Sequence, residues 1–146
     1  MNEPQVIRAM LGEDMLLGTA ERPRTLAVIG LSDRPDRPSY YVSAYMQQQG
    51  YHILPINPSV PAVLGETSFA SLSALKERPD VVNVFRMPSF IPAIVDEVLA
   101  LGLTDLWVQQ GIMHREAAHR AEAAGIRVVM DRCIMIEHRR AKASRS

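Results

Sequence analysis

Five short apolar runs, each continuous rather than alternating with polar residues, constrain the fold of this chain most strongly. Segments with helical periodicity separate the runs, so strand and helix patterns alternate along the chain. Strands that are apolar on both faces are typical of a parallel sheet covered by helices on both sides. The expected strands are residues 25–30, 52–57, 81–86, 105–110 and 126–131. We therefore predict an α/β fold with a doubly wound, mainly parallel five-stranded sheet.

Glycines punctuate the helical segments at the points where helices commonly end. The expected helices are residues 4–17, 38–49, 71–77 (a short one), 89–101 and 113–124. We find no internal repeat and no linker, and 146 residues suffice for one core. The chain is therefore interpreted as a single Rossmann-like domain over 1–146, with its core at about 18–138. The basic and polar stretch from His138 to Ser146, including the tail 139–146, is expected to fray.

Charge and composition limit the classes of partner. Sixteen basic and sixteen acidic side chains cancel at neutral pH, so no global field favours nucleic acid or an anionic membrane. No apolar run approaches the roughly 20 residues of a membrane span, and the acidic N-terminal segment lacks a signal-peptide pattern. The single cysteine, Cys133, rules out an internal disulfide. We expect a cytoplasmic protein that binds neither nucleic acid nor membranes.

Polar loops follow the first four expected strands, at residues 30–39, 57–60, 85–88 and 109–112. Ligands of open parallel α/β sheets bind outside the carboxyl ends of the strands. Any one loop is polar in most proteins, but four at the same edge predict a ligand site there.

The first loop carries the groups that suit phosphate oxygens. Serine hydroxyls and helix N-terminal N–H groups donate to phosphate, and arginine adds charge-assisted bonds. The dinucleotide fingerprint G-x-G-x-x-G is absent, and two prolines remove backbone donors. Phosphate binding would therefore rest on side chains, unless the arginines are merely solvated. The candidate residues are Gly30, Ser32, Arg34, Arg37 and Ser39.

The end of the second expected strand argues against an ordinary NAD site. Such a site normally has Asp or Glu there to accept hydrogen bonds from the ribose hydroxyls. This chain has Asn57-Pro58-Ser59 instead.

Few residues are candidates for catalysis. His114 and His119 lie five apart on an expected helix and so face different sides. No serine stands in a nucleophile-elbow pattern, and no cluster has metal-ligand spacing. Cys133 is either a nucleophile or a small buried residue. We therefore expect neither a catalytic set nor a metal site.

Four short motifs occur at the strand ends: RPS after the first strand, NP after the second, FR after the third and QQGI after the fourth. Together they resemble the small CoA-binding proteins. These are single domains similar to the CoA-binding Rossmann domain of the succinyl-CoA synthetase α subunit. The resemblance extends over about residues 18–138.

The resemblance implies that CoA or an acyl-CoA lies across the carboxyl edge of the sheet. The first loop, with Gly30, Ser32, Arg34, Arg37 and Ser39, would hold the phosphates, and Asn57, Pro58 and Val60 would border the adenosine. Phe85, Arg86 and Pro88 would line the path of the pantetheine arm, and Gln110 and Gly111 the neighbouring crevice. The phosphorylated histidine of the synthetase comes from a further domain without counterpart in this chain, so the resemblance does not imply ligase activity.

Two other functions remain open from the residues themselves. An NAD(P)-binding enzyme or redox-sensing module would use Arg34 or Arg37 for a 2′-phosphate. A regulatory protein would act through an interface on its N-terminal helix or basic tail, as a homo-oligomer or with an unidentified protein partner.

Overall fold

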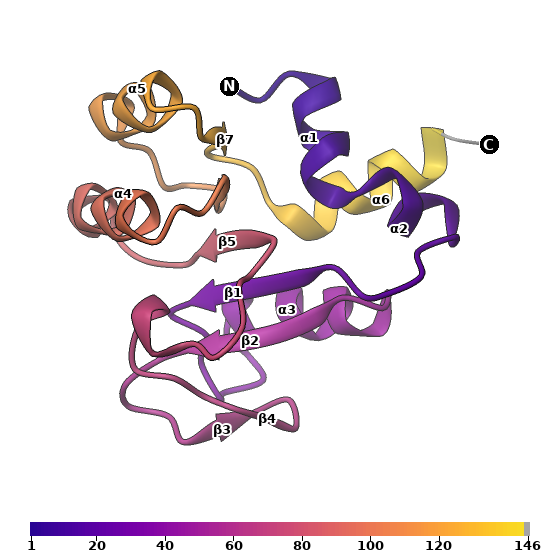
Figure 1. Cartoon of the computed structure of the whole chain (residues 1–146). Helices are drawn as coiled ribbons and strands as arrows, with labels where there is room; N and C mark the ends of the chain where they lie inside the picture. Colours follow the sequence, from indigo (N-terminus) through magenta and orange to yellow (C-terminus); the bar gives the residue numbers. More distant parts are fainter. Residues whose placement is uncertain (145–146) are drawn as a thin grey trace.

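The five expected strands form one sheet in which every neighbouring pair is parallel. We describe residues 1–144 from a computed structural model of the chain (Figure 1). The strands are β1 (Thr25–Ile29), β2 (His52–Ile56), β5 (Val81–Val84), β6 (Asp105–Val108) and β7 (Arg127–Val129), in the order β2-β1-β5-β6-β7. The predicted α/β fold with a doubly wound parallel sheet is confirmed.

Helices cover both faces of the sheet, which explains why the strands are apolar throughout (Figure 1). On β1, Ala27 faces one core while Leu26 and Val28 face the other. The first core is closed by α4 (Ile91–Ala100) and α5 (Arg115–Ala123). The second is closed by α1 (Pro4–Leu11), α2 (Glu13–Leu17), α3 (Pro38–Gln48) and α6 (Ile134–Ser144).

The N-terminal helical segment is two helices rather than the one expected over 4–17. Gly12 separates α1 from α2 and has φ +87°, a conformation that other residues rarely adopt. A Cβ at this position would also lie 3.0 Å from Cδ of Arg24. The break turns α2 so that Leu16 is fully buried in the second core.

The expectation of a frayed tail is wrong for residues 138–144, which belong to α6. Residues 145–146 of that tail lie outside the described residues. The helix buries Ile134, His138 and Ala141 along one stripe, at the spacing of a helix face. It packs against α1, α2 and α3, so it belongs to the core rather than to a tail.

A short hairpin and two 3₁₀ turns lie in the loops between the main strands and helices. The chain between β2 and β5 forms a two-stranded antiparallel hairpin, β3 (Ala62–Val63) and β4 (Glu66–Thr67), which the sequence analysis did not predict. The expected short helix over 71–77 is only a 3₁₀ turn, η1 (Leu72–Ala74). A second turn, η2 (Pro88–Phe90), precedes α4.

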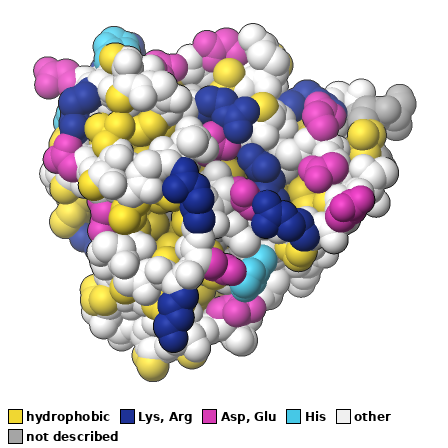
Figure 2. All heavy atoms as spheres, in the orientation of Figure 1, with side chains coloured by type: hydrophobic (Ala, Val, Ile, Leu, Met, Phe, Trp, Pro, Cys, Tyr) yellow, Lys and Arg dark blue, Asp and Glu magenta, His cyan; other side chains and the backbone are white. Residues whose placement is uncertain are grey.

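Basic and acidic side chains are interspersed over the face shown in Figure 2, in keeping with the zero net charge. Within residues 1–144, the helices are too short or too polar for any of them to span a bilayer.

Candidate functional site

The strand order places a crevice beyond the carboxyl ends of the paired strands β1 and β5. From β1 the chain proceeds to β2 on one side and later to β5 on the other, which makes this pair the topological switch point of the sheet. Backbone hydrogen bonds join the end of β1 to both of its neighbours: the Gly30 N–H donates to the Ile56 carbonyl of β2, and the Phe85 N–H, just after β5, donates to the Ile29 carbonyl, both at 2.9 Å.

Gly30 is required here by packing. Its φ is +85°, and a Cβ would lie 2.5 Å from the carbonyl oxygen of Phe85. The close approach that this glycine permits is between two protein segments, so it brings the loops after β1 and β5 together.

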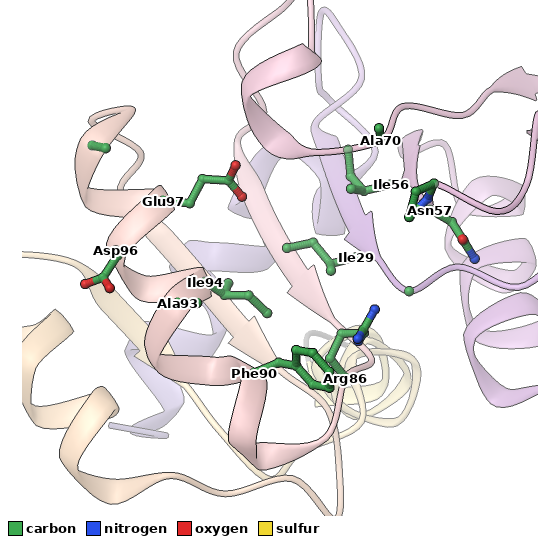
Figure 3. Close-up of a pocket in the computed structure, with 13 residues that line it drawn as sticks. Ile29, Ile56, Asn57, Ala70, Arg86, Phe90, Ala93, Ile94, Asp96 and Glu97 are labelled. Carbon is green, nitrogen blue, oxygen red and sulfur yellow. The ribbon is translucent and has the colours of Figure 1, made fainter.

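The crevice has two lobes, and Gly30 and Arg86 line both. The β2-side lobe has a volume of about 710 Å³ and is shown in Figure 3. Its lining consists of Ile29, Gly30, Ile56, Asn57, Pro58, Ala70, Arg86, Phe90, Ala93, Ile94, Asp96, Glu97 and Ala100.

The α6-side lobe is larger, with a volume of about 1020 Å³. It lies among the starts of α3 and α6 and the loops after β5 and β6. Its lining consists of Gly30, Ser32, Arg37, Pro38, Ser39, Tyr41, Val42, Phe85, Arg86, Met87, Pro88, Gln109, Gln110, Gly111, Ile112, Cys133, Met135 and Ile136.

Arg86 occupies the boundary between the lobes. Its guanidinium carbon lies 3.8 Å from the centre of the Phe90 ring, and Figure 3 shows the two side chains together. Stacking on an aromatic face holds a guanidinium in place without consuming its hydrogen-bond donors. No carboxylate among residues 1–144 pairs with this half-buried arginine. Its donors are therefore available to an anionic ligand.

The loop after β1 and the first turn of α3 bring Ser32 and Ser39 to the α6-side lobe. Oγ of Ser39 accepts a hydrogen bond from the Ser32 N–H at 3.0 Å, and Oγ of Ser32 accepts one from the Arg34 N–H at 3.1 Å. Each hydroxyl keeps its own hydrogen for an acceptor in the crevice. No side chain caps the start of α3. Pro38 has no N–H, and the N–H groups of Tyr40 and Tyr41 donate to the Arg37 carbonyl, so the Ser39 N–H is the first-turn donor left for a ligand.

The two arginines of this loop differ in position. Arg37 lines the α6-side lobe. Arg34 lines neither lobe; its side chain is 64% exposed and lies 3.7 Å from the carboxylate of Asp36. The structure therefore brings Arg37 to the crevice and leaves Arg34 outside it.

Asn57, at the end of β2, connects two loops of the crevice. Its Nδ2 donates to the Leu31 carbonyl at 3.0 Å, and its Oδ1 accepts from the Ser59 N–H at 2.9 Å. Asn57 and Pro58 line the β2-side lobe, whereas Val60 lines neither lobe and packs on the second core.

The remaining expected site residues, Phe85, Pro88, Gln110 and Gly111, all line the α6-side lobe. Gln109, in the loop expected to follow the fourth strand, was not among the predicted site residues. Met135 and Ile136 were not among them either, because α6 was not predicted. Cys133, just before α6, is 9% exposed and lines the same lobe.

The four histidines lie away from the crevice. His52 lies 3.6 Å from Glu66 and 3.4 Å from Glu77, on the outer side of β2. Nδ1 of His114 caps α5 by accepting from the Ala117 N–H. His138 is buried in the second core. Among residues 1–144, the histidine, cysteine and carboxylate side chains form no group suited to a metal ion.

A family model described as a CoA binding domain matches residues 24–139 of the chain. Among curated proteins, the uncharacterised protein YneT of Bacillus subtilis is 41% identical over 118 residues, which cover 81% of this chain and 87% of YneT.

Solved structures share the whole architecture. The structure of cell-free ID.343 from Thermus thermophilus is 41% identical, with a TM-score of 0.83, covering 95% of this chain and 98% of that one. A hypothetical protein from Pyrococcus horikoshii is 29% identical, also with a TM-score of 0.83, covering 95% and 92%. A dinucleotide-forming acetyl-coenzyme A synthetase from Candidatus Korarchaeum cryptofilum shares the fold. Its TM-score is 0.63 at 19% identity, over 74% of this chain and 26% of that enzyme.

Proposed function

Since the chain belongs to the family of CoA-binding domains, we propose that it binds CoA or an acyl-CoA in the crevice at the carboxyl edge of the sheet and catalyses no reaction of its own. The observation that carries this proposal is the pair of lobes meeting at Gly30 and the unpaired Arg86. Pockets for drug-sized ligands have volumes of roughly 300–1,000 Å³. Two connected lobes suit a longer ligand with an anionic centre.

The chemistry of the lining suggests how the ligand would lie. Its diphosphate would meet Arg86, Arg37 and the serine hydroxyls near the start of α3, where charge-assisted bonds are available. The adenosine would enter the β2-side lobe beside Asn57 and Pro58. The pantetheine arm would extend through the α6-side lobe, past Phe85, Pro88, Gln110 and Gly111.

The absence of catalysis is part of the proposal. The ionisable side chains that line the crevice are Arg37, Tyr41, Arg86, Asp96, Glu97 and Cys133. Asp96 already pairs with Arg120. No nucleophile and base among the described residues lie in contact there, which is the arrangement that covalent catalysis needs. A role in storing, sensing or delivering the ligand fits this lining better than turnover does.

Titration calorimetry with CoA tests the proposal, with NADPH as the competing ligand. We expect heat of binding with CoA, and a higher melting temperature because the ligand prefers the folded state. NADPH should bind much more weakly, since the loop after β1 lacks the G-x-G-x-x-G fingerprint of dinucleotide sites. If millimolar CoA produces no heat of binding and no thermal shift, the proposal is overturned. Tighter binding of NADPH than of CoA would favour the NAD(P) alternative.

A further inference from the structure

Gln109 is a buried amide held in one orientation at the floor of the α6-side lobe. It follows β6, is 4% exposed and lines the lobe. Its Oε1 accepts two hydrogen bonds, each of 3.1 Å, from Nδ2 of Asn83 and from the backbone N–H of Ile134. Through these contacts Gln109 connects Asn83 on β5 with the first residue of α6.

The assignment of oxygen and nitrogen in this amide follows from its partners. A backbone N–H can only donate, so the Gln109 atom facing Ile134 must be the oxygen. Asn83 is oriented in the same way, because its Nδ2 also donates to the Trp107 carbonyl at 3.3 Å. The two amide hydrogens of Gln109 must therefore point elsewhere.

Those hydrogens have no acceptor among residues 1–144. Buried donors are rarely left unsatisfied, because removing them from water without a partner is unfavourable. Among the polar side-chain atoms of residues 1–144, only Oγ of Ser43 is both fully buried and without a hydrogen-bond partner. Nε2 of Gln109 also has no partner, so it is not fully buried. As Gln109 lines the α6-side lobe, its donor is open to a molecule in that lobe.

We propose that Nε2 of Gln109 donates a hydrogen bond to a carbonyl oxygen of the pantetheine arm or of its thioester. This inference rests on the proposed function. The donor is uncharged, and Val42, Ile112 and Ile136 line the same lobe, which suits a neutral acceptor better than a phosphate. β6 is two strands away from β1, or about 10 Å at the usual strand spacing. Gln109 thus lies beyond the diphosphate region, along the arm.

The variant Gln109→Glu tests the proposal with little change in shape. A carboxylate still accepts from Asn83 and Ile134, but its second oxygen repels a carbonyl oxygen instead of donating to it. We expect CoA affinity to fall roughly tenfold or more, the effect of losing one well-formed hydrogen bond and adding repulsion. Gln48→Glu makes the same chemical change on an exposed residue at the far end of α3 and should leave CoA affinity unchanged.

Three ligands distinguish the acceptors: CoA, acetyl-CoA and S-ethyl-CoA, which lacks the thioester carbonyl. Equal losses with all three identify an amide carbonyl of the arm, and a loss confined to acetyl-CoA identifies the thioester; both support the proposal. Wild-type affinity of Gln109→Glu for all three overturns it, while the proposed function stands. If the wild-type protein binds none of them, the proposed function itself fails.

A measurement on the wild-type protein covers the case in which the variant does not fold. In a ¹H–¹⁵N correlation spectrum, the assigned side-chain NH₂ signals of Gln109 should shift when CoA is added. Unchanged signals at saturating CoA would contradict the proposed contact.

Discussion

His138 makes the stability of the protein depend on pH in a way that can be calculated. Its side chain is buried on α6, with Nδ1 2.8 Å from the Tyr45 hydroxyl and the rings of Tyr45 and Tyr51 packed edge-on. Burial lowers the pKa of His138 to about 4, and the nearby positive charge of Lys142 contributes to that shift. The folded protein therefore holds this imidazole neutral over most of the acidic range.

The sign follows from proton binding. An unfolded histidine has a pKa of about 6.5, so between about pH 6.5 and about pH 4 the unfolded chain binds a proton that the folded protein does not. The stabilisation is complete above about pH 6.5 and is lost as the pH falls toward the folded-state pKa. One pKa unit corresponds to about 1.4 kcal/mol. Acidification from about pH 7 to about pH 4.5 should thus lower the free energy of unfolding by about 2 kcal/mol through His138 alone.

Urea unfolding of the wild type and of His138→Gln, each at both pH values, isolates this contribution. Carboxylates titrate in both proteins and cancel in the comparison, whereas only the wild type carries the histidine. We expect the wild type to lose about 2 kcal/mol more than the variant on acidification, with similar m-values. Equal losses in the two proteins would refute the reasoning, because they would show that His138 has the same pKa folded and unfolded.

Three further predictions concern the site and the core. Gly30→Ala should destabilise the protein by at least about 2 kcal/mol in urea unfolding, because it combines positive φ with a clash against the Phe85 carbonyl; unchanged stability would contradict the packing role. Arg37→Ala should weaken CoA binding by about 1–3 kcal/mol in calorimetry, and more than Arg34→Ala does, since only Arg37 lines the crevice; equal effects would place the phosphates elsewhere. Asp105→Ala should lower the free energy of unfolding by about 2–3 kcal/mol in thermal or urea unfolding, because it removes a buried carboxylate paired with two arginines. A loss below about 0.5 kcal/mol would show that these ion pairs contribute little to stability.

The sheet could be predicted from the sequence because its strands are buried on both faces, and short continuous apolar runs between turn residues are typical of such strands. Helix α6 could not be predicted in this way. Its stripe includes His138, whose burial depends on Tyr45 and Tyr51 from other parts of the chain. At the break after α1, the guanidinium of Arg24, which is distant in sequence, donates to the Ala9 and Met10 carbonyls. The residues next to each of these positions in sequence do not indicate such long-range contacts.

The candidate site shows the same division. The loops at the carboxyl edge could be located from strand order alone, since parallel strands end at one edge. Arg34 and Arg37 are indistinguishable in sequence, and only the path of the loop separates them. Gln109 falls where the expected fourth strand and the following loop overlap, and the sequence does not show how its amide is oriented. Its functional interest comes from the backbone N–H of Ile134, which fixes the amide.

One wall of the α6-side lobe is the beginning of α6, and this has a thermodynamic consequence. Tertiary contacts hold the helix in place, including a 3.3 Å hydrogen bond from Nη1 of Arg8 to the Ala141 carbonyl. Elements held in this way open locally with their own free energy. A ligand that requires the closed helix binds with an observed dissociation constant equal to the intrinsic value divided by the closed fraction. Amide exchange in α6 should therefore slow in proportion to ligand saturation, which makes the helix a reporter of occupancy.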